Sequence, residues 1–159
     1  MYILIYMWFE RVISGLEDGG VRFAVAGGHA VALHGAVRGT IDLDFVLACT
    51  RENFIAAEKA LKALGLVSRV PVVAEEVFSF RKEYVEKRNM IAWGFIHPKD
   101  PSQAVDLVLT WELKTGDIKR VRAAGRDIPV LSRPALIAMK KAAGRPQDLA
   151  DVAALERLP

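Results

Sequence analysis

The sequence contains a single cysteine, Cys49, among 159 residues. One cysteine excludes an intrachain disulfide and any zinc site built from several cysteines, and it is typical of a reducing cytoplasm. Internal repeats and low-complexity tracts are also absent. The apolar stretch 1–9 is too short to span a bilayer, lacks a basic leader and runs into Glu10 and Arg11. We therefore expect a cytoplasmic chain that does not associate with a membrane.

The composition indicates a folded chain with a slightly basic surface. Apolar residues make up 52% of the sequence, which excludes disorder as the default state, and the formal net charge is +3. Mild basicity permits a nucleotide or RNA partner without requiring one. We expect one domain over 1–159, with its core at about 21–131 and C-terminal helices at about 133–158.

The most informative stretch is 23–47, an apolar strand, a diglycine turn, a short helix and a second strand that opens with two acids, FAVAGGHAVALHGAVRGTIDLDFVL. Side chains alternate along a strand, so Asp42 and Asp44 are expected to project the same way. Neighbouring carboxylates repel each other, and a divalent cation would relieve that repulsion. The Gly27-Gly28 turn leaves backbone N–H groups open to an anion. The stretch therefore predicts a phosphate beside a metal ion.

A third acid lies in another apolar stretch. Asp106 is flanked by valine and leucine in the sequence Val-Asp-Leu-Val. An isolated acid in such a stretch is most simply explained by an edge strand with the carboxylate in solvent, since a buried charge is costly. Together with Asp42 and Asp44, however, Asp106 would complete an oxygen cage suited to Mg²⁺ or Mn²⁺.

The rest of the chain mixes strands with helices, which predicts an α/β or α+β fold with a mixed sheet flanked by helices. Helices are expected at 8–17, 29–36, 51–64, 111–123, 133–143 and 146–158. Strands are expected at 21–26, 43–48, 91–96, 104–109 and 128–131. Pro71 limits 66–73 to an edge strand or a turn, and 75–87 fits either an exposed helix or a hairpin.

These motifs resemble the nucleotidyltransferase superfamily of the DNA polymerase β type. The shared pattern is Gly27-Gly28, thirteen further residues, the acid–hydrophobe–acid sequence at 42–44, and the later Asp106. The local sequence and the tail LIAMKKAAGRPQDLAD resemble the small bacterial branch that contains the AbiEii-type toxins. The resemblance covers roughly 21–156 and is weak in the middle of that range.

The resemblance implies a role for each of these groups. Asp42 and Asp44 would ligate metal, Asp106 would hold the second ion and help to activate a hydroxyl, and the triphosphate would lie against Gly27-Gly28. The implied reaction is in-line transfer of a nucleoside monophosphate from an NTP to that hydroxyl, with Mg²⁺ or Mn²⁺ as cofactor.

Three further residues are candidates for nucleotide binding. Arg38 would either bind phosphate as a fork or pair with one of the acids, and Thr40 would contact the nucleotide or only favour the strand. Lys140 would either reach the triphosphate or lie on a solvated helix face. The two acids Asp148 and Asp151 are expected to be structural, tying down Lys140 or Arg145.

Two functional hypotheses remain open. The first is an enzyme that modifies RNA, tRNA or a protein, and one version of it is the toxin of a toxin–antitoxin pair with an antitoxin partner. The second is a non-catalytic module of the same fold that binds a nucleotide or a partner protein. Basic residues could form an RNA-facing surface, although solvated charge is the commoner explanation, and they are Arg81, Lys82, Lys87, Arg88, Lys119, Arg120, Arg122 and Arg126.

Overall fold

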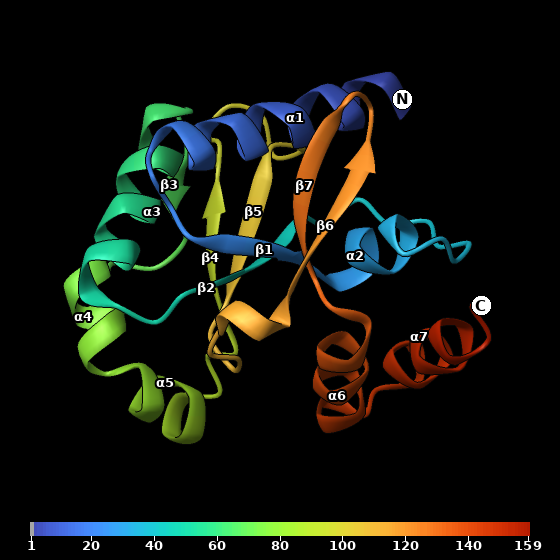
Figure 1. Cartoon of the computed structure of the whole chain (residues 1–159). Coiled ribbons are helices and arrows are strands. Elements are labelled where there is room, and N and C mark those ends of the chain that lie inside the picture. Colours follow the sequence, from blue (N-terminus) through green and yellow to red (C-terminus); the bar gives the residue numbers. More distant parts are fainter. Residues whose placement is uncertain (1) are drawn as a thin grey trace.

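A computed structural model describes residues 2–159 and has a seven-stranded mixed sheet with helices around it (Figure 1). The strands are β1 (Phe23–Ala26), β2 (Asp44–Leu47), β3 (Val67–Ser68), β4 (Ala92–Ile96), β5 (Ala104–Val108), β6 (Ile118–Ala123) and β7 (Arg126–Leu131). The helices are α1 (Tyr2–Asp18), α2 (Gly27–Leu33), α3 (Arg51–Ala63), α4 (Ala74–Ser79), α5 (Arg81–Arg88), α6 (Arg133–Ala143) and α7 (Pro146–Glu156), with a 3₁₀ turn, η1, at Thr115–Asp117. The expected mixed α/β fold is confirmed.

The sheet has the order β3-β4-β5-β2-β1-β7-β6. Strand β2 runs antiparallel to β1 and parallel to β5, while β7 runs parallel to β1. The outer pairs, β3 with β4, β4 with β5 and β6 with β7, are antiparallel. The acidic strands β2 and β5 are therefore direct neighbours in the middle of the sheet.

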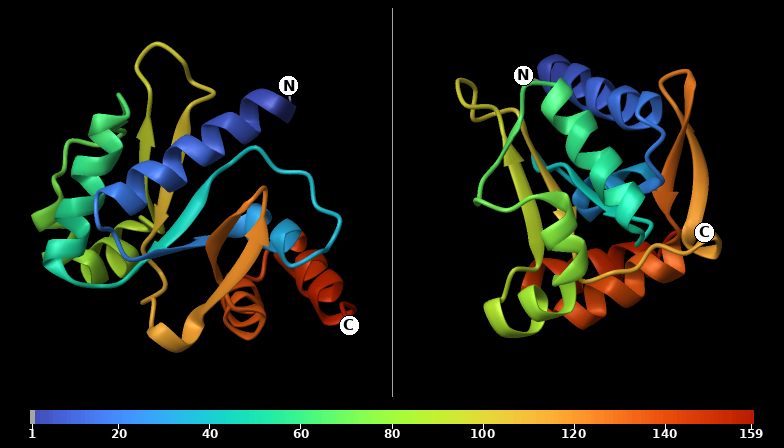
Figure 2. Two further views of the ribbon diagram at one scale, coloured as in Figure 1. Left: turned by 45° about the horizontal axis from the view of Figure 1, so that its top comes forward. Right: turned by 90° about the vertical axis from the view of Figure 1, so that its left-hand side faces the viewer.

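The helices form two groups. Helix α1 contacts α3, and both lie away from the C-terminal pair α6 and α7, which pack on each other (Figures 1 and 2). The short helix α2 leads out of β1 and contacts α7. Helix α7, on which α6 packs, is thereby placed beside α2.

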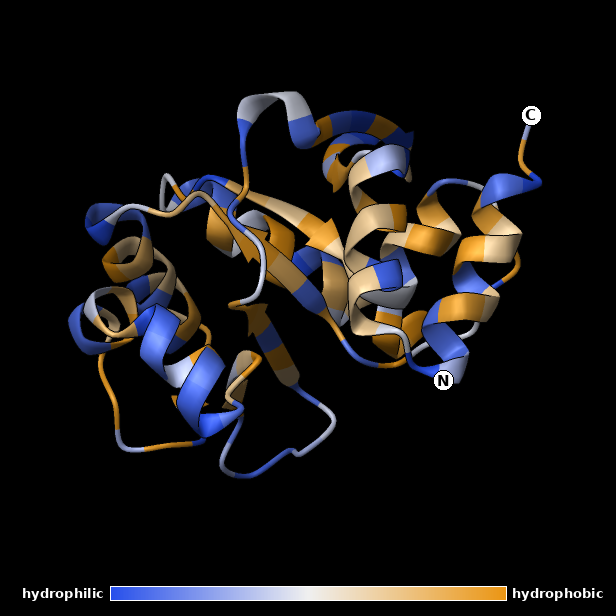
Figure 3. Cartoon of the chain, turned by 90° about the horizontal axis from the view of Figure 1, so that it is seen from below, coloured by the Kyte–Doolittle hydropathy of each residue, from blue (hydrophilic) through white to orange (hydrophobic). Residues whose placement is uncertain are grey.

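The core lies between the sheet and these helices. Its largest fully buried side chains include Trp93, Phe45 and Phe95, and Ile13 and Leu16 of α1 are completely inaccessible. Coloured by hydropathy, the central strands are mostly apolar and the polar segments lie mainly on outer helices and loops (Figure 3). Burial of this apolar surface is the main stabilising contribution to the fold.

The starts of α3, α6 and α7 agree with the sequence predictions, whereas the helix expected at 8–17 begins at Tyr2 and the helix expected at 29–36 is Gly27–Leu33. The Thr50 hydroxyl accepts a hydrogen bond from the backbone N–H of Asn53 at 3.2 Å and caps α3. Ser132 caps α6 in the same way, and Pro146 opens α7. These signals are local, because a capping side chain needs only its own first turn.

The prediction of a helix at 111–123 is wrong. Most of this stretch is η1 followed by strand β6, which pairs with β7 as a hairpin. Ala124 and Gly125 have φ values of 52° and 77°, the left-handed backbone of the tight turn that hairpins prefer. The Ala-Gly pair between two alternating stretches was the sequence signal for this hairpin.

Other segments refine the expected boundaries. Segment 75–87 forms two short helices, α4 and α5, and the edge strand predicted within 66–73 is β3. Strand β2 begins only at Asp44, so Asp42 precedes it and the prediction of two acids on one strand is wrong. No helix in the described part of the chain is long and apolar enough to cross a membrane.

Candidate active site

Asp44 and Asp106 lie side by side on neighbouring strands. In the parallel pairing of β2 with β5 their Cα atoms are partners, and the Asp106 backbone N–H donates to the Leu43 carbonyl at 2.8 Å. Asp44 is also paired with Ala26 of β1, and Asp106 with Gly94 of β4. Because side chains of partnered residues emerge on the same face of a sheet, the two carboxylates share one face.

The diglycine turn closes this site on the β1 side. Gly27 follows Ala26 directly and has φ = 62°, a backbone that favours glycine. A Cβ at residue 27 would lie 2.1 Å from Asp44 Oδ2, so the carboxylate rests against bare backbone. A Cβ on Gly28 would lie 2.8 Å from the Cβ of Thr40. Both glycines are therefore required for the turn to approach Asp44 and Thr40.

The third predicted acid, Asp42, lies in the segment just before β2 and is exposed. Its charge nevertheless acts on both of the other carboxylates, because it raises the pKa of Asp44 and of Asp106. Leu43, between the two acids, is buried as expected.

The site concentrates negative charge. Burial, followed by the charges of Asp106 and Asp42, raises the pKa of Asp44 to about 6, against the opposing charges of Lys140 and Arg145. Burial also raises the pKa of Asp106, and here Arg69 opposes the shift while Asp42 adds to it. Such repulsion between acids is relieved by protonation or by a cation.

The donor set suits a divalent cation of the magnesium type, because carboxylate oxygens on one sheet face are its preferred protein ligands. Among residues 2–159, however, no three His, Cys, Asp or Glu side chains are grouped closely enough to hold a metal ion without movement. The paired Asp44 and Asp106, with Asp42 on the adjacent segment, are the residues that would hold it.

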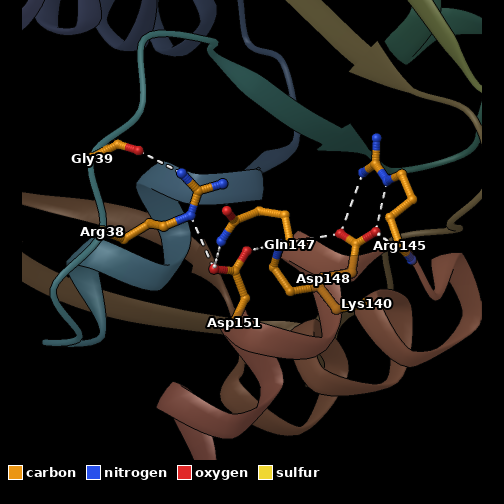
Figure 4. A network of polar contacts seen from close by, with 7 residues as sticks. All are labelled: Arg38, Gly39, Lys140, Arg145, Gln147, Asp148 and Asp151. Carbon is orange, nitrogen blue, oxygen red and sulfur yellow. Dashed lines mark hydrogen bonds and ion pairs between the residues drawn. The ribbon is translucent and has the colours of Figure 1, made fainter.

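Figure 4 shows a network of ion pairs that includes Lys140 and Arg145, the two cations whose charges oppose the rise in the pKa of Asp44. Lys140 of α6 is 7% exposed, and its Nζ donates to Asp151 Oδ2 at 2.7 Å and lies 3.7 Å from Asp148 Oδ1. Asp151 also accepts from Arg38 Nε at 2.9 Å and from Gln147 Nε2 at 3.0 Å. The ion pair between Arg38 and Asp151 therefore ties the segment that leads to Asp42 to helix α7.

The contacts of Asp148 and Asp151 in this network indicate the role of these two acids. Asp148 accepts from the Arg145 Nε at 2.7 Å, and Asp151 binds Lys140, so both acids are structural, as predicted. Burial alone would raise the pKa of each acid, but hydrogen bonds and the neighbouring cations outweigh it and lower the pKa of both. Lys140 is buried in these ion pairs, so the alternative prediction that it lies on a solvated helix face is wrong.

Sequence reasoning missed two cations near the acids, Arg69 and Arg145, whose charges act on Asp106 and Asp44 respectively. A signal for Arg69 was available in Gly94, because a glycine inside an apolar strand often marks a close approach of another group. Two histidines of this region pack against the fold: His34 Nε2 donates to the Leu131 carbonyl at 2.8 Å, and the His29 ring stacks on Phe9.

A separate cavity of about 610 Å³ opens at the other end of β2 and β5. It is lined by Cys49, Leu109 and Thr110, which follow the two strands, and by Arg81 and Lys82 of α5. Arg81 donates to the Leu109 carbonyl and to Glu112. Burial raises the pKa of the Cys49 thiol, which disfavours the reactive thiolate. None of the three acids lines this cavity.

The arrangement of strands and turn is that of the nucleotidyltransferase fold. The chain is similar to the antibiotic-resistance factor ANT(2'')-Ia, with a TM-score of 0.67, 12% identity, and coverage of 98% of this chain and 84% of that one. It is also similar to the lincosamide antibiotic adenylyltransferase LnuA, with a TM-score of 0.64, 14% identity, and coverage of 96% and 97%.

A third similar structure is an antigenic nucleotidyltransferase-like protein from Paracoccidioides brasiliensis, with a TM-score of 0.52, 16% identity, and coverage of 97% of this chain and 73% of that one. No family sequence model and no curated protein sequence matches the chain. The structural likeness confirms the expected superfamily fold, and it does not single out the AbiEii-toxin branch.

Replacing Asp44 by Asn should stabilise the metal-free protein at pH 7.5 by about 1–3 kcal/mol, because the substitution removes a carboxylate whose pKa is raised by burial and by two other acids. A raised pKa means that the folded state holds the proton more tightly than the unfolded chain. The stability of the native protein therefore increases as the pH falls from about 6 towards 4, and the advantage of Asp44→Asn shrinks over the same interval. Denaturant unfolding in EDTA at several pH values measures both effects.

The matched control for this measurement is Asp127→Asn, which alters an exposed ion pair with Arg122. It should change the free energy of unfolding by less than about 0.5 kcal/mol at each pH measured. Equal stability of Asp44→Asn and the native protein at pH 7.5 would contradict the repulsion at the site.

Replacing Asp151 by Asn should lower the free energy of unfolding by about 2–4 kcal/mol, since it leaves the buried Lys140 ammonium without its closest partner. Glu156→Gln is the control, because Glu156 of the same helix pairs with Lys141 at an exposed position. Thermal or denaturant unfolding at pH 7.5 compares the two variants. Similar small effects for both would show that the buried pair does not hold α6 against α7.

Proposed function

We propose that the protein is a metal-dependent nucleotidyltransferase, which moves a nucleoside monophosphate from an NTP to a hydroxyl group. The observation that carries this proposal is the register of Asp44 with Asp106 on one sheet face beside a turn in which Gly27 leaves no room for a side chain. The fold shared with an antibiotic-resistance factor and with a lincosamide antibiotic adenylyltransferase supports the same reaction type.

Each group then has a chemical task. Asp42, Asp44 and Asp106 would hold Mg²⁺ or Mn²⁺, which supplies charge neutralisation at the phosphates and at the attacking and leaving oxygens. The Gly27-Gly28 turn would bind the triphosphate through its backbone. Arg38, Thr40 and Lys140 complete the proposed nucleotide site: Thr40 packs on Gly28, while Lys140 and Arg38 contribute positive charge held in place by Asp151.

The reaction itself needs one bond made and one broken. The acceptor oxygen bonds to the α-phosphorus while the bond from that phosphorus to pyrophosphate breaks. The hydroxyl proton passes to the Asp106 carboxylate, which lies beside Asp44 on the same sheet face. Positioning and charge neutralisation account for most of the catalysis in such a transfer.

The same proposal includes the kind of acceptor and the physiological role. RNA, including tRNA, or a protein is the acceptor that a toxin of this kind would modify, and an antitoxin would then be its partner. The alternative is a module that binds a nucleotide or a partner without turnover. The retention of all three acids favours the enzyme, because a module that only binds a nucleotide does not need a base next to the metal ligands.

Nucleotide binding should require both the metal and the acids. In calorimetric titrations with each NTP in Mg²⁺, the native protein should bind at least one nucleotide, and EDTA should abolish that binding. Asp42→Asn/Asp44→Asn should reduce the affinity by at least about tenfold, since the metal ligands are lost, while Asp127→Asn should bind as the native protein does. Binding that is indifferent to metal and to the double substitution would rule out the metal site.

Transfer separates the enzyme from the module. Incubation with each α-labelled NTP and either total RNA or cell lysate should label a macromolecule, and Asp106→Asn should reduce the labelling by at least about a hundredfold through loss of the base. Metal-dependent nucleotide binding without labelling by any NTP would favour the module.

A further inference from the structure

Arg69 extends the row of partnered residues that contains the two acids. In the antiparallel pairing of β3 with β4, Ser68 is the partner of Phe95, and the Arg69 backbone N–H then donates to the Gly94 carbonyl at 2.9 Å. Gly94 is the partner of Asp106, which is the partner of Asp44. Arg69 therefore lies two strands away from Asp106 on the same sheet face, about 10 Å between backbones.

The missing side chain of Gly94 lets Arg69 cross that distance. A Cβ at residue 94 would lie 2.8 Å from Arg69 Cδ, 3.2 Å from Arg69 Nε and 3.1 Å from Asp106 Oδ1. The arginine side chain thus lies across the bare glycine backbone and points to Asp106. Any larger residue at 94 would collide with the arginine stem and push the guanidinium away from the acid.

The segment that carries Arg69 is fixed in place. The Ser68 hydroxyl donates to the Val70 carbonyl at 2.6 Å, and it accepts a hydrogen bond from the indole N–H of the fully buried Trp93 at 2.9 Å. The turn on either side of Arg69 is therefore anchored to the core through β4. This anchoring holds the base of the arginine side chain at the edge of the site.

The charge of Arg69 is not used by the fold. Within residues 2–159, the exposed Arg69 is hydrogen-bonded through its backbone N–H alone, although its charge opposes the rise in the pKa of Asp106. By contrast, the cations on the other side of the acids, Lys140 and Arg145, are bound to Asp151 and Asp148. An unpaired guanidinium at the edge of a site is available to an anion.

The position of Arg69 in the row of partnered residues indicates that it lies on the side of the acceptor and not on the side of the NTP. The diglycine turn continues from Ala26 on the β1 side of the acids, whereas Arg69 approaches them from the β4 side. In an in-line displacement the attacking and leaving oxygens lie on opposite sides of the phosphorus. If pyrophosphate leaves on the Gly27 side, the attacking hydroxyl enters on the side of Arg69.

We propose that Arg69, which extends across Gly94 towards Asp106, is a specificity-determining residue that binds a phosphate of the acceptor close to the attacked hydroxyl. This inference rests on the proposed function. It assigns the acceptor to the hydroxyl compounds that carry a phosphate, as the sugar at the end of a nucleotide chain does, and it disfavours acceptors with amino groups near the hydroxyl, which Arg69 would repel.

The test measures the acceptor site while the nucleotide site is occupied. Protein saturated with Mg²⁺ and a non-hydrolysable NTP analogue is titrated by calorimetry with a nucleoside 5′-monophosphate and with the same nucleoside. Both probes have the same hydroxyls, and only one has a phosphate. The native protein should bind the monophosphate at least about tenfold more tightly, the range expected for a charge-assisted contact.

The variants then identify the residue responsible. Arg69→Ala should remove the preference for the monophosphate and leave the affinity for the NTP analogue unchanged, and Gly94→Ala should also remove the preference by displacing the arginine. Arg22→Ala is the control, because Arg22 is exposed and precedes β1 at its end remote from Asp44. Arg69 is exposed, so its replacement should not prevent folding, which a melting temperature checks.

The unfavourable outcomes are distinct. Equal affinity of the native protein for both probes, or a preference that survives Arg69→Ala, would overturn the acceptor assignment alone. A loss of affinity for the analogue itself in Arg69→Ala would overturn it too, since Arg69 would then be a ligand of the NTP. If the native protein fails to bind the analogue in the presence of Mg²⁺, the proposed function fails and this inference fails with it.

Discussion

Repulsion between two carboxylates in register on neighbouring parallel strands is the constraint around which this molecule is arranged. Asp44 and Asp106 share a sheet face, and burial together with their mutual charge raises the pKa of Asp44 to about 6. A fold does not gain stability from such a pair. Its retention is explained by the chemistry of the site, since raised acid pKa values are concentrated at functional positions.

The surrounding cations differ in how firmly they are held. Lys140 and Arg145 lie on the C-terminal side of the molecule and are bound by Asp148 and Asp151, two acids that are almost inaccessible to solvent. Each of these two buried acids is therefore paired with a cation. Arg69, on the other side, is anchored only through its backbone and turn. The site therefore combines a preformed positive region with one cation that remains free to bind a substrate.

Much of the fold could be predicted from local patterns. The caps at Thr50 and Ser132, the prolines that open helices and the apolar strands around the acids are all decided within a few residues. The prediction of a helix at 111–123 was wrong because the conformation of β6 depends on its pairing with β7, a strand outside that segment. Asp42 was predicted to lie on β2, but β2 begins at Asp44, the partner of the last residue of β1, Ala26. The sequence around Asp42 does not contain this limit.

The sequence by itself determined which groups are available: a diglycine turn, an acid–hydrophobe–acid segment, a third acid in an apolar stretch, and a tail whose acids hold its own cations. Only the tertiary structure decided that Asp44 and Asp106 are direct partners, that Arg69 crosses Gly94, and that Arg38 is tied to Asp151. The physical reason is that strand order and register join residues far apart in the chain, and they are fixed by the packing of the whole sheet rather than by any one segment.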